Sequence, residues 1–198
     1  MTKLVILDRD GVINEDSDSY VKTAKEWVPL PGSIEAISRL CQAGYTVVVA
    51  TNQSGIGRGL FDLDDLEAMH SKLSDLLLDA DAQLSGIFYC PHKPDDGCNC
   101  RKPAPGLLDA IAKEWDVSLA GVPIVGDSLR DLQAGLTHQC IPILVRTGKG
   151  AKTESKLPEQ QESALQQARV FDDLSQVVDY LLDAAPVTQT MTLKNNTK

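Results

Sequence analysis

The chain has 198 residues, of which 42% are hydrophobic and 24% charged, a balance typical of a globular protein that folds as one domain. Nineteen basic and 28 acidic side chains give a net charge of −9, which argues against a general nucleic-acid binder, because such proteins are more often basic. No apolar run approaches the ~20 residues that a membrane-spanning helix needs. The N-terminal apolar run ends at Asp8, too early for a signal peptide, so we expect a cytoplasmic protein.

Six short apolar runs predict β-strands, and amphipathic helical patterns lie between them. The predicted strands cover residues 3–7, 45–49, 86–89, 122–125, 141–145 and 169–171. Apolar side chains at helical spacing predict helices around residues 34–41, 66–77, 108–115 and 174–181, the second with Asp62 as its N-cap. Continuous apolar strands that alternate with helices indicate an α/β fold, a three-layer sandwich with a mainly parallel central sheet. In such sheets the active site lies beyond the carboxyl ends of the strands.

These elements predict one domain over residues 1–185 and a flexible C-terminal tail over residues 186–198. The tail has little apolar content to bury, which favours a loose conformation. Residues 148–160 are polar and predict a long surface loop that runs into a helix.

The first strand ends in two carboxylates, Asp8 and Asp10, followed directly by Gly11. Side chains two residues apart in an extended segment point to the same side, which is here the crevice at the strand's carboxyl end. Two ionised carboxylates so close repel each other, so the pair favours a shared proton or a divalent cation, and oxygen ligands favour Mg²⁺. An ordinary acidic pair at a strand-to-turn junction is the alternative for these residues taken alone.

Further reactive side chains follow other predicted strands. Thr51 ends the second strand, Lys102 follows the third after an intervening loop, and Asp127 follows the fourth. Together with Asp8 and Asp10, these side chains supply a carboxylate nucleophile, metal ligands and a fixed cation for phosphate oxygens. These are the groups that catalysis of phosphoryl transfer requires. A solvated surface lysine is the alternative reading of Lys102.

A third pattern is the cysteine–histidine cluster of residues 90–100, in which Cys90, His92, Cys98 and Cys100 have the spacing C-x-H-x5-C-x-C. Four such ligands among proline and glycine turns predict a closed, tetrahedral structural Zn²⁺ site that stiffens a zinc-binding loop. Thiolate ligation also suits a reducing compartment. A disulfide or unligated thiols remain the alternatives. A disulfide would leave one of the three cysteines unpaired and give His92 no role.

In order and spacing, these segments resemble the four motifs of the haloacid dehalogenase (HAD) superfamily of phosphatases over nearly the whole chain. The matching segments are Asp8-Arg9-Asp10-Gly11, Thr51, Lys102 and Gly126-Asp127-Ser128-Leu129-Arg130-Asp131. The resemblance implies a HAD-like Rossmannoid fold in which Asp8 attacks phosphorus and forms an aspartyl-phosphate. Asp10 would protonate the leaving oxygen and then activate water, while Thr51 and Lys102 would hold the phosphoryl group. The implied Mg²⁺ ligands are Asp8, the backbone carbonyl of Asp10 and Asp127, with Asp131 orienting the site.

The zinc cluster with Thr51-Asn52-Gln53-Ser54 and Arg101-Lys102 narrows the resemblance to the D-glycero-D-manno-heptose-1,7-bisphosphate 7-phosphatase subfamily. That resemblance implies removal of the C7 phosphate in activated-heptose biosynthesis for lipopolysaccharide or other surface glycans. The implied substrate contacts are Asp16, Tyr20, Thr51, Asn52, Gln53, Ser54, Arg101 and Lys102. Histidinol-phosphate phosphatases share much of the pattern and are the nearest enzymatic alternative. An end-trimming nucleic-acid phosphatase and a non-catalytic zinc-bearing scaffold are further alternatives.

The intervals between these motifs are too short for a separate cap domain, so we expect three loops to form the rim of the site: residues 14–25, residues 55–60 and the zinc loop. Arg58 and Arg101 are candidates for binding the distal phosphate, because arginine suits bidentate contacts. A surface turn at Gly57-Arg58-Gly59 is the alternative for Arg58. The segment Arg146-Thr147-Gly148-Lys149-Gly150 lacks the spacing of a phosphate-binding P-loop and is expected to lie near the rim. We expect a monomer whose partner is a small sugar bisphosphate rather than nucleic acid or membrane.

Overall fold

All six predicted strands are present and form one wholly parallel sheet in the computed structural model, which describes residues 3–183. They are β1 (Leu4–Leu7), β2 (Thr46–Asn52), β3 (Gly86–Cys90), β4 (Pro123–Gly126), β5 (Ile141–Val145) and β6 (Arg169–Phe171). Their order in the sheet is β3-β2-β1-β4-β5-β6. The predicted α/β class is therefore confirmed. The predicted tail over residues 186–198 lies outside the described residues.

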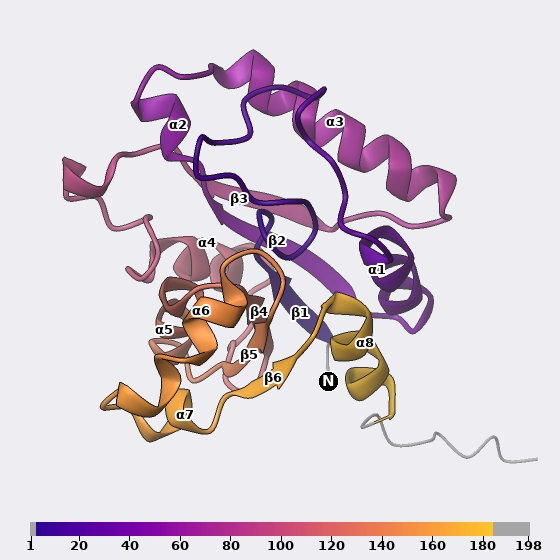
Figure 1. Ribbon diagram of the computed structural model, residues 1–198. Coiled ribbons are helices and arrows are strands. Elements are labelled where there is room, and N and C mark those ends of the chain that lie inside the picture. The colour runs from indigo at the N-terminus through magenta and orange to yellow at the C-terminus, as the bar shows by residue number, and fades with distance from the viewer. Residues whose placement is uncertain (1–2, 184–198) are drawn as a thin grey trace, which may run out of the picture.

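Helices cover both faces of the sheet (Figure 1). One face packs against α1 (Ser33–Gln42), α3 (Leu63–Asp79) and α8 (Leu174–Asp183), and the other against α4 (Gly106–Glu114) and α5 (Leu129–Leu136). Shorter elements in the connections are α2 (Ser54–Gly57), α6 (Gly150–Glu154), α7 (Ser163–Gln166) and the 3₁₀ turns η1 (Pro94–Asp96) and η2 (Leu157–Glu159). At the start of α3, the Asp62 side chain accepts a hydrogen bond from the backbone N–H of Asp65, which confirms the predicted cap.

The central strand β1 shows why its sequence is a continuous apolar run. Leu4 and Ile6 pack into the core beneath α4, whereas Val5 and Leu7 pack into the core beneath α1. Alternate side chains therefore point to opposite layers, and all four are buried. Burial on both faces requires apolar residues at every position of the strand.

The strands that follow β1 in the sequence are added first on one side of it and then on the other. The chain builds β2 and β3 on one side of β1 and then crosses to place β4, β5 and β6 on the other side. This creates a switch point between β1 and β4, where a crevice opens beyond the strands' carboxyl ends. The backbone N–H of Asp8 donates to the Val125 carbonyl at 2.9 Å, so the loops that follow β1 and β4 start side by side.

The loop of residues 14–29, which follows the first motif, is closed at its base. The backbone N–H of Glu15 donates to the Val28 carbonyl at 2.9 Å, and Trp27 is fully buried. From α3, the Lys72 ammonium donates to the carbonyls of Ala24 and Trp27 at 2.8 and 2.6 Å. Within residues 3–183 no separate cap domain is inserted between the strands, so loops such as this one border the crevice.

One expectation for the connections was wrong. The polar segment 148–160 is not a long loop but contains α6 and η2. Leu157 is buried against Leu132, Leu144 and Leu165, and this cluster draws the segment onto the sheet's outer strands. A single apolar side chain in a polar stretch gives too little periodicity to predict such docking.

None of the helices within residues 3–183 has both the length and the apolar character to cross a membrane.

Candidate active site

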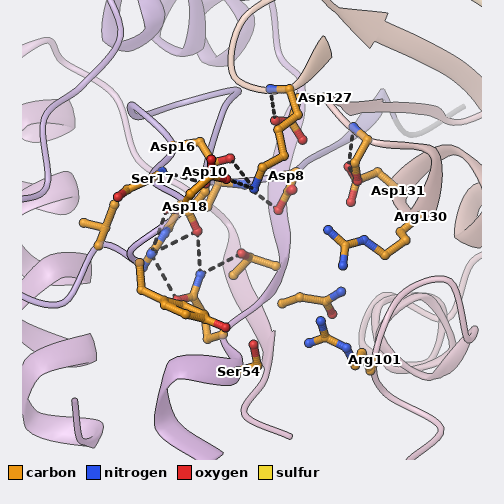
Figure 2. A pocket seen from close by; sticks show the side chains of 18 residues that line it. Asp8, Asp10, Asp16, Ser17, Asp18, Ser54, Arg101, Asp127, Arg130 and Asp131 are labelled. Carbon is orange, nitrogen blue, oxygen red and sulfur yellow. Dashed lines mark hydrogen bonds and ion pairs between the residues drawn. The ribbon is translucent and has the colours of Figure 1, made fainter. Parts of the chain in front are cut away.

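A cavity of about 220 Å³ opens at the switch point, beyond the carboxyl ends of β1, β2 and β4 (Figure 2). Most of the side chains predicted for the site line it, although they come from segments far apart in the sequence. These are Asp8, Asp10, Asp16, Tyr20, Thr51, Asn52, Gln53, Ser54, Arg101 and Asp127. Of the predicted rim loops, residues 14–25 contribute to the lining of the cavity, whereas residues 55–60 and the zinc loop of residues 90–100 do not.

Asp8 directly follows β1 and lines the cavity, with one carboxylate oxygen held in place. Its Oδ1 accepts from the backbone N–H of Arg9 at 2.7 Å and lies 3.0 Å from Lys102 Nζ. Among the described residues, no hydrogen bond engages Oδ2, so this oxygen is available for chemistry. Burial and the neighbouring charge of Asp131 raise the pKa of Asp8 to about 7, against the opposing effect of Lys102.

Lys102 is a buried cation, only 1% exposed, with three partners. Its Nζ donates to the Ala50 carbonyl at 2.6 Å and pairs with Asp131 Oδ1 at 2.6 Å, besides Asp8. Burial alone would lower the pKa of Lys102, but Asp131 and Asp8 outweigh it and the pKa is raised. The alternative of a solvated surface lysine is therefore wrong, and Lys102 brings a permanent positive charge to the site.

Asp10 is held by a network of hydrogen bonds to its carboxylate. Its carboxylate accepts from Arg9 at 3.0 and 3.1 Å, from Asn14 Nδ2 at 2.8 Å and from Gln53 Nε2 at 2.8 Å. Burial raises the pKa of Asp10, but the charge of Arg9 and these hydrogen bonds outweigh it, so the pKa is lowered. Gly11 follows at φ 82°, and a side chain there would collide with the Asp127 carboxylate. The turn after β1 thus fixes Asp10 beside the cavity.

Carboxylate oxygens of Asp8, Asp127 and Asp131 lie within 4.8 Å of one another, a spacing that suits a divalent cation. Burial and the charge of Asp131 raise the pKa of Asp127 to about 8, because they make its ionised form unfavourable. A bound cation would stabilise that ionised form. Asp131 is already saturated, because Oδ1 pairs with Lys102 and Oδ2 accepts from the N–H and hydroxyl of Ser128 at 3.0 and 2.6 Å. The residues present therefore fit Mg²⁺ on Asp8 and Asp127, with Asp131 in an orienting position.

Residues at the carboxyl end of β2 connect the Asp10 network to the segment of Lys102. Gln53 Nε2 donates to the Thr51 hydroxyl at 2.9 Å as well as to Asp10. The Asn52 amide exchanges hydrogen bonds with the backbone of Lys102 at 3.0 and 3.1 Å. These contacts set Thr51, Gln53 and the Lys102 segment at fixed positions around the phosphoryl pocket.

The predicted zinc ligands converge in space. Cys100 Sγ lies 3.1 Å from Cys90 Sγ, 3.6 Å from Cys98 Sγ and 3.2 Å from His92 Nδ1. A tetrahedral Zn²⁺ with bonds of about 2.0–2.3 Å needs ligand separations of roughly 3.5 Å, so this donor set fits the ion. All four donors come from protein, which gives the cluster a structural rather than catalytic character.

Arginine side chains mark the side of the cavity away from the 14–29 loop. Arg101 and Arg130 both line it, and among the described residues neither forms a salt bridge. Burial and the nearby charge of Arg130 lower the pKa of Arg101, and Figure 2 shows both guanidinium groups directed into the cavity. Arg58 does not line the cavity; its guanidinium lies over the Tyr20 ring, 6.0 Å from the centroid.

Sequence reasoning missed two residues of the site: Arg9, which is buried and holds Asp10, and Arg130, which faces Arg101. The loop after β5 lies near the rim as expected, since Lys149 lines the cavity. Arg9 and Arg130 lie inside the matched motifs, which was the available signal. His70 on α3 is half-buried with its Nε2 3.4 Å from Arg9 Nη1, and burial lowers its pKa to about 4.

Comparisons with known proteins agree with this geometry. A family model described as HAD-hydrolase-like matches residues 99–177, and one described as polynucleotide kinase 3 phosphatase matches residues 3–129. A D-glycero-beta-D-manno-heptose-1,7-bisphosphate 7-phosphatase from Pseudomonas aeruginosa is 55% identical over 180 residues, covering 90% of this chain and 97% of that protein. A protein of the same name from Neisseria meningitidis serogroup A is 48% identical over 190 residues, or 93% and 98%.

Among solved structures, the D,D-heptose 1,7-bisphosphate phosphatase from Bordetella bronchiseptica, complexed with magnesium and phosphate, superposes with a TM-score of 0.87. It is 54% identical, with 93% of this chain and all of that chain covered. The corresponding enzyme from Burkholderia thailandensis gives a TM-score of 0.70 at 45% identity, with 91% and 99% covered.

Fold and site thus define a HAD-like phosphatase, a hydrolase with paired carboxylates at the end of its first strand. Within that class, the chain belongs to the family of D-glycero-β-D-manno-heptose-1,7-bisphosphate 7-phosphatases. The resemblance noted from the motifs is confirmed.

The zinc cluster generates a test. Replacing a ligand in Cys98→Ser is expected to lower the bound zinc from one ion per chain to well below one, because the serine hydroxyl is a poor substitute for a thiolate. Loss of the ion should also loosen residues 90–100, which would appear as faster proteolysis within this loop. Metal analysis by mass spectrometry measures the first effect, and Cys41→Ser, outside the cluster, is the matched control. Unchanged zinc in Cys98→Ser would refute the ligand set.

Proposed function

We propose that this protein hydrolyses the C7 phosphate of D-glycero-β-D-manno-heptose 1,7-bisphosphate in a Mg²⁺-dependent reaction, as a step toward activated heptose for surface glycans. The observation that carries the proposal is the joint presence of a HAD-like phosphoryl site and close relatives of this named activity across nearly the whole chain. The β-anomer is proposed from the names of those relatives.

In the proposed mechanism, the free Oδ2 of Asp8 attacks phosphorus, and the bond between phosphorus and the C7 oxygen breaks. Asp10 gives its proton to that leaving oxygen, and an aspartyl-phosphate remains on Asp8. Asp10 then takes a proton from a water that attacks the same phosphorus, which releases phosphate and restores the Asp8 carboxylate. The network around Asp10 stabilises its carboxylate form and so favours the second role. Phosphate bound beside it would favour the protonated form needed for the first.

The surrounding groups counter the charge on the transferring phosphoryl group. Lys102 is proposed to bind phosphoryl oxygens with its ammonium, and Thr51 with its hydroxyl, from positions that are already fixed before substrate arrives. Asp8, the Asp10 carbonyl and Asp127 would hold Mg²⁺, which, when bound, neutralises phosphate charge and orients it for in-line attack.

The distal C1 phosphate needs a second positive site, and Arg101 with Arg130 supports one. Two guanidinium groups near each other repel, and burial penalises their charge further, so an anion between them would lower the free energy. Arg101 also donates to the His92 carbonyl at 3.3 Å, which ties its position to the zinc loop. Arg58 is proposed to act only through Tyr20, since it does not line the cavity.

The alternatives fit less well. Histidinol phosphate carries one phosphate and would leave the arginine pair without an anion. The match to the polynucleotide phosphatase model reflects the shared HAD-like core, and the charge of −9 disfavours a nucleic-acid substrate. An inert scaffold would not need the buried Lys102–Asp8–Asp131 cluster. We further propose a cytoplasmic monomer, in a compartment reducing enough to keep zinc thiolates intact.

Substrate choice is tested by phosphate release with Mg²⁺ from both heptose bisphosphate anomers, histidinol phosphate and a short 3′-phosphorylated oligonucleotide. We expect kcat/KM for both bisphosphates to exceed that for the other two substrates by at least about tenfold, because only the bisphosphates occupy both positive sites. Between the anomers we expect the β-anomer to be preferred, as the names of the relatives indicate. A preference for histidinol phosphate or the oligonucleotide would keep the phosphatase chemistry and overturn the proposed substrate.

The nucleophile is tested by Asp8→Asn. An amide cannot form the aspartyl-phosphate, so kcat should fall by at least about 10³-fold, while zinc content stays unchanged. Trapping of ³²P-labelled protein after acid quench gives a second readout, expected for the parent protein and absent for the variant. Full turnover by Asp8→Asn would contradict the assignment.

The distal-phosphate site is tested by Arg130→Ala, with the exposed Arg39→Ala on α1 as the control. Loss of a charge-assisted contact should raise KM for the bisphosphate about 10- to 100-fold. KM for heptose 7-phosphate, which lacks the distal group, should change far less. Equal effects on both substrates would place Arg130 elsewhere in the mechanism.

A further inference from the structure

The loop after β5, Arg146-Thr147-Gly148-Lys149-Gly150, has no assigned part in the reaction, although it reaches the cavity through Lys149. The loop's base is braced by Arg146, which pairs with Glu154 at 2.7 Å and with Asp172 at 2.6 Å. This bracing comes from two different elements, so the loop leaves the sheet in a defined direction.

The loop is also attached to the centre of the site through its backbone. The Thr147 hydroxyl donates to the Gly11 carbonyl at 2.6 Å, and the backbone N–H of Lys149 donates to Asp127 Oδ2 at 2.7 Å. Gly148, at φ 57°, packs so closely that a side chain there would collide with Asp127 and with the backbone of Gly11. The main chain of Lys149 is therefore fixed against the candidate magnesium site.

From this fixed position, the Lys149 side chain extends across the cavity rim to the 14–29 loop. Its Nζ lies 2.7 Å from Asp16 Oδ2 and 3.6 Å from Asp18 Oδ1. Asp16 is mostly buried, at 18% exposure, whereas Asp18 is almost fully exposed, so the pair with Asp16 is the stronger one. Figure 2 shows both carboxylates on the same side of the cavity.

The tip of the 14–29 loop, residues 16–20, has few other ties to the rest of the protein. Its described hydrogen bonds are local, such as those from the backbone of Tyr20 to the Ser17 carbonyl at 3.0 Å and of Ser19 to the Ser17 hydroxyl at 3.1 Å. Among the described residues, the carboxylates of the tip form salt bridges with Lys149 alone. The base of the loop is held separately, by Lys72 and the buried Trp27.

We propose that Lys149 is a positioning residue, which holds the tip of the 14–29 loop at the cavity so that Asp16 meets the sugar in a fixed place. Exposed ion pairs usually contribute little to stability, because two long side chains lose conformational entropy when they pair. Here part of that cost is avoided, since the Lys149 backbone is already fixed by Asp127 and the side chain of Asp16 is short. The inference deepens the proposed function and rests on it for the identity of the sugar.

The two parts of the substrate depend on the loop tip to different degrees. The phosphoryl pocket around Asp8 and Lys102 is formed by strand ends and needs no help from the loop tip. Binding of the sugar, by contrast, depends on the tip being in place, and a mobile tip would have to be ordered at the expense of affinity. Loss of Lys149 should therefore affect KM more than kcat.

The experiment compares Lys149→Met, Lys149→Arg and the control Lys152→Met, which lies one turn away on α6. Hydrogen exchange is first measured without substrate, with Mg²⁺ present. Backbone amides of residues 16–20 are expected to exchange at least about fivefold faster in Lys149→Met, because the ion pair that ties the tip to the loop after β5 is lost and the contact of Arg58 with the Tyr20 ring remains. Lys149→Arg and Lys152→Met should match the parent protein. Parent-like exchange in Lys149→Met would overturn the proposal.

Kinetics with the heptose bisphosphate form the second arm. Lys149→Met should raise KM about 5- to 20-fold with a much smaller change in kcat, and Lys149→Arg should restore most of the affinity. Because Lys149 acts through Asp16, the double variant with Asp16→Asn should be no worse than the poorer single variant. Multiplicative effects would instead mean that Lys149 touches the substrate independently, and would overturn the positioning role.

The two arms separate this inference from the proposed function. If the parent protein fails to hydrolyse the bisphosphate, the proposed substrate is wrong, but hydrogen exchange still decides whether Lys149 holds the loop tip. If the parent protein is active and exchange at residues 16–20 does not respond to Lys149→Met, the inference fails while the proposed function stands.

Discussion

The site depends on one buried charge, the ammonium of Lys102. An isolated ammonium in a protein interior is strongly unfavourable, so its burial at 1% exposure requires partners, and Asp8, Asp131 and the Ala50 carbonyl supply them. These partners come from the ends of β1 and β2 and from α5. Satisfying one cation therefore brings three segments together. It also leaves the Asp8 carboxylate with one oxygen held and the other free.

Opposing charges explain how an acidic protein can bind a doubly phosphorylated sugar. Burial and the charge of Asp131 make ionisation of Asp127 and Asp8 unfavourable, which raises the pKa values of both. A divalent cation would stabilise the two ionised carboxylates. Positive charge surrounds the same cavity, because Arg9, Arg101, Arg130 and Lys149 line it and the Lys102 ammonium lies against Asp8. The net charge of −9 then disfavours long polyanions, while a small bisphosphate still meets a local positive field.

Rigid and less rigid parts of the site have different physical origins. The phosphoryl pocket lies on the ends of parallel strands, whose positions are fixed by the core and by backbone hydrogen bonds. The zinc cluster extends this rigidity to Arg101. The 14–29 loop instead reaches over the cavity as a closed loop, and its tip is attached through side chains such as Lys149. We therefore expect binding of the sugar to be more sensitive to single surface substitutions than the chemical step.

The sequence by itself determined where the strands lie along the chain, and it predicted which carboxylates and which cysteine and histidine side chains come together, because apolar runs, strand-end motifs and cysteine spacing are local patterns. Only the tertiary structure decided that Arg130 faces Arg101, that Arg58 turns away to Tyr20, and that Lys149 pairs with Asp16. Those contacts join residues from separate loops. Their formation depends on how helices and loops pack around the crevice, and no local periodicity encodes which surface cation reaches which partner.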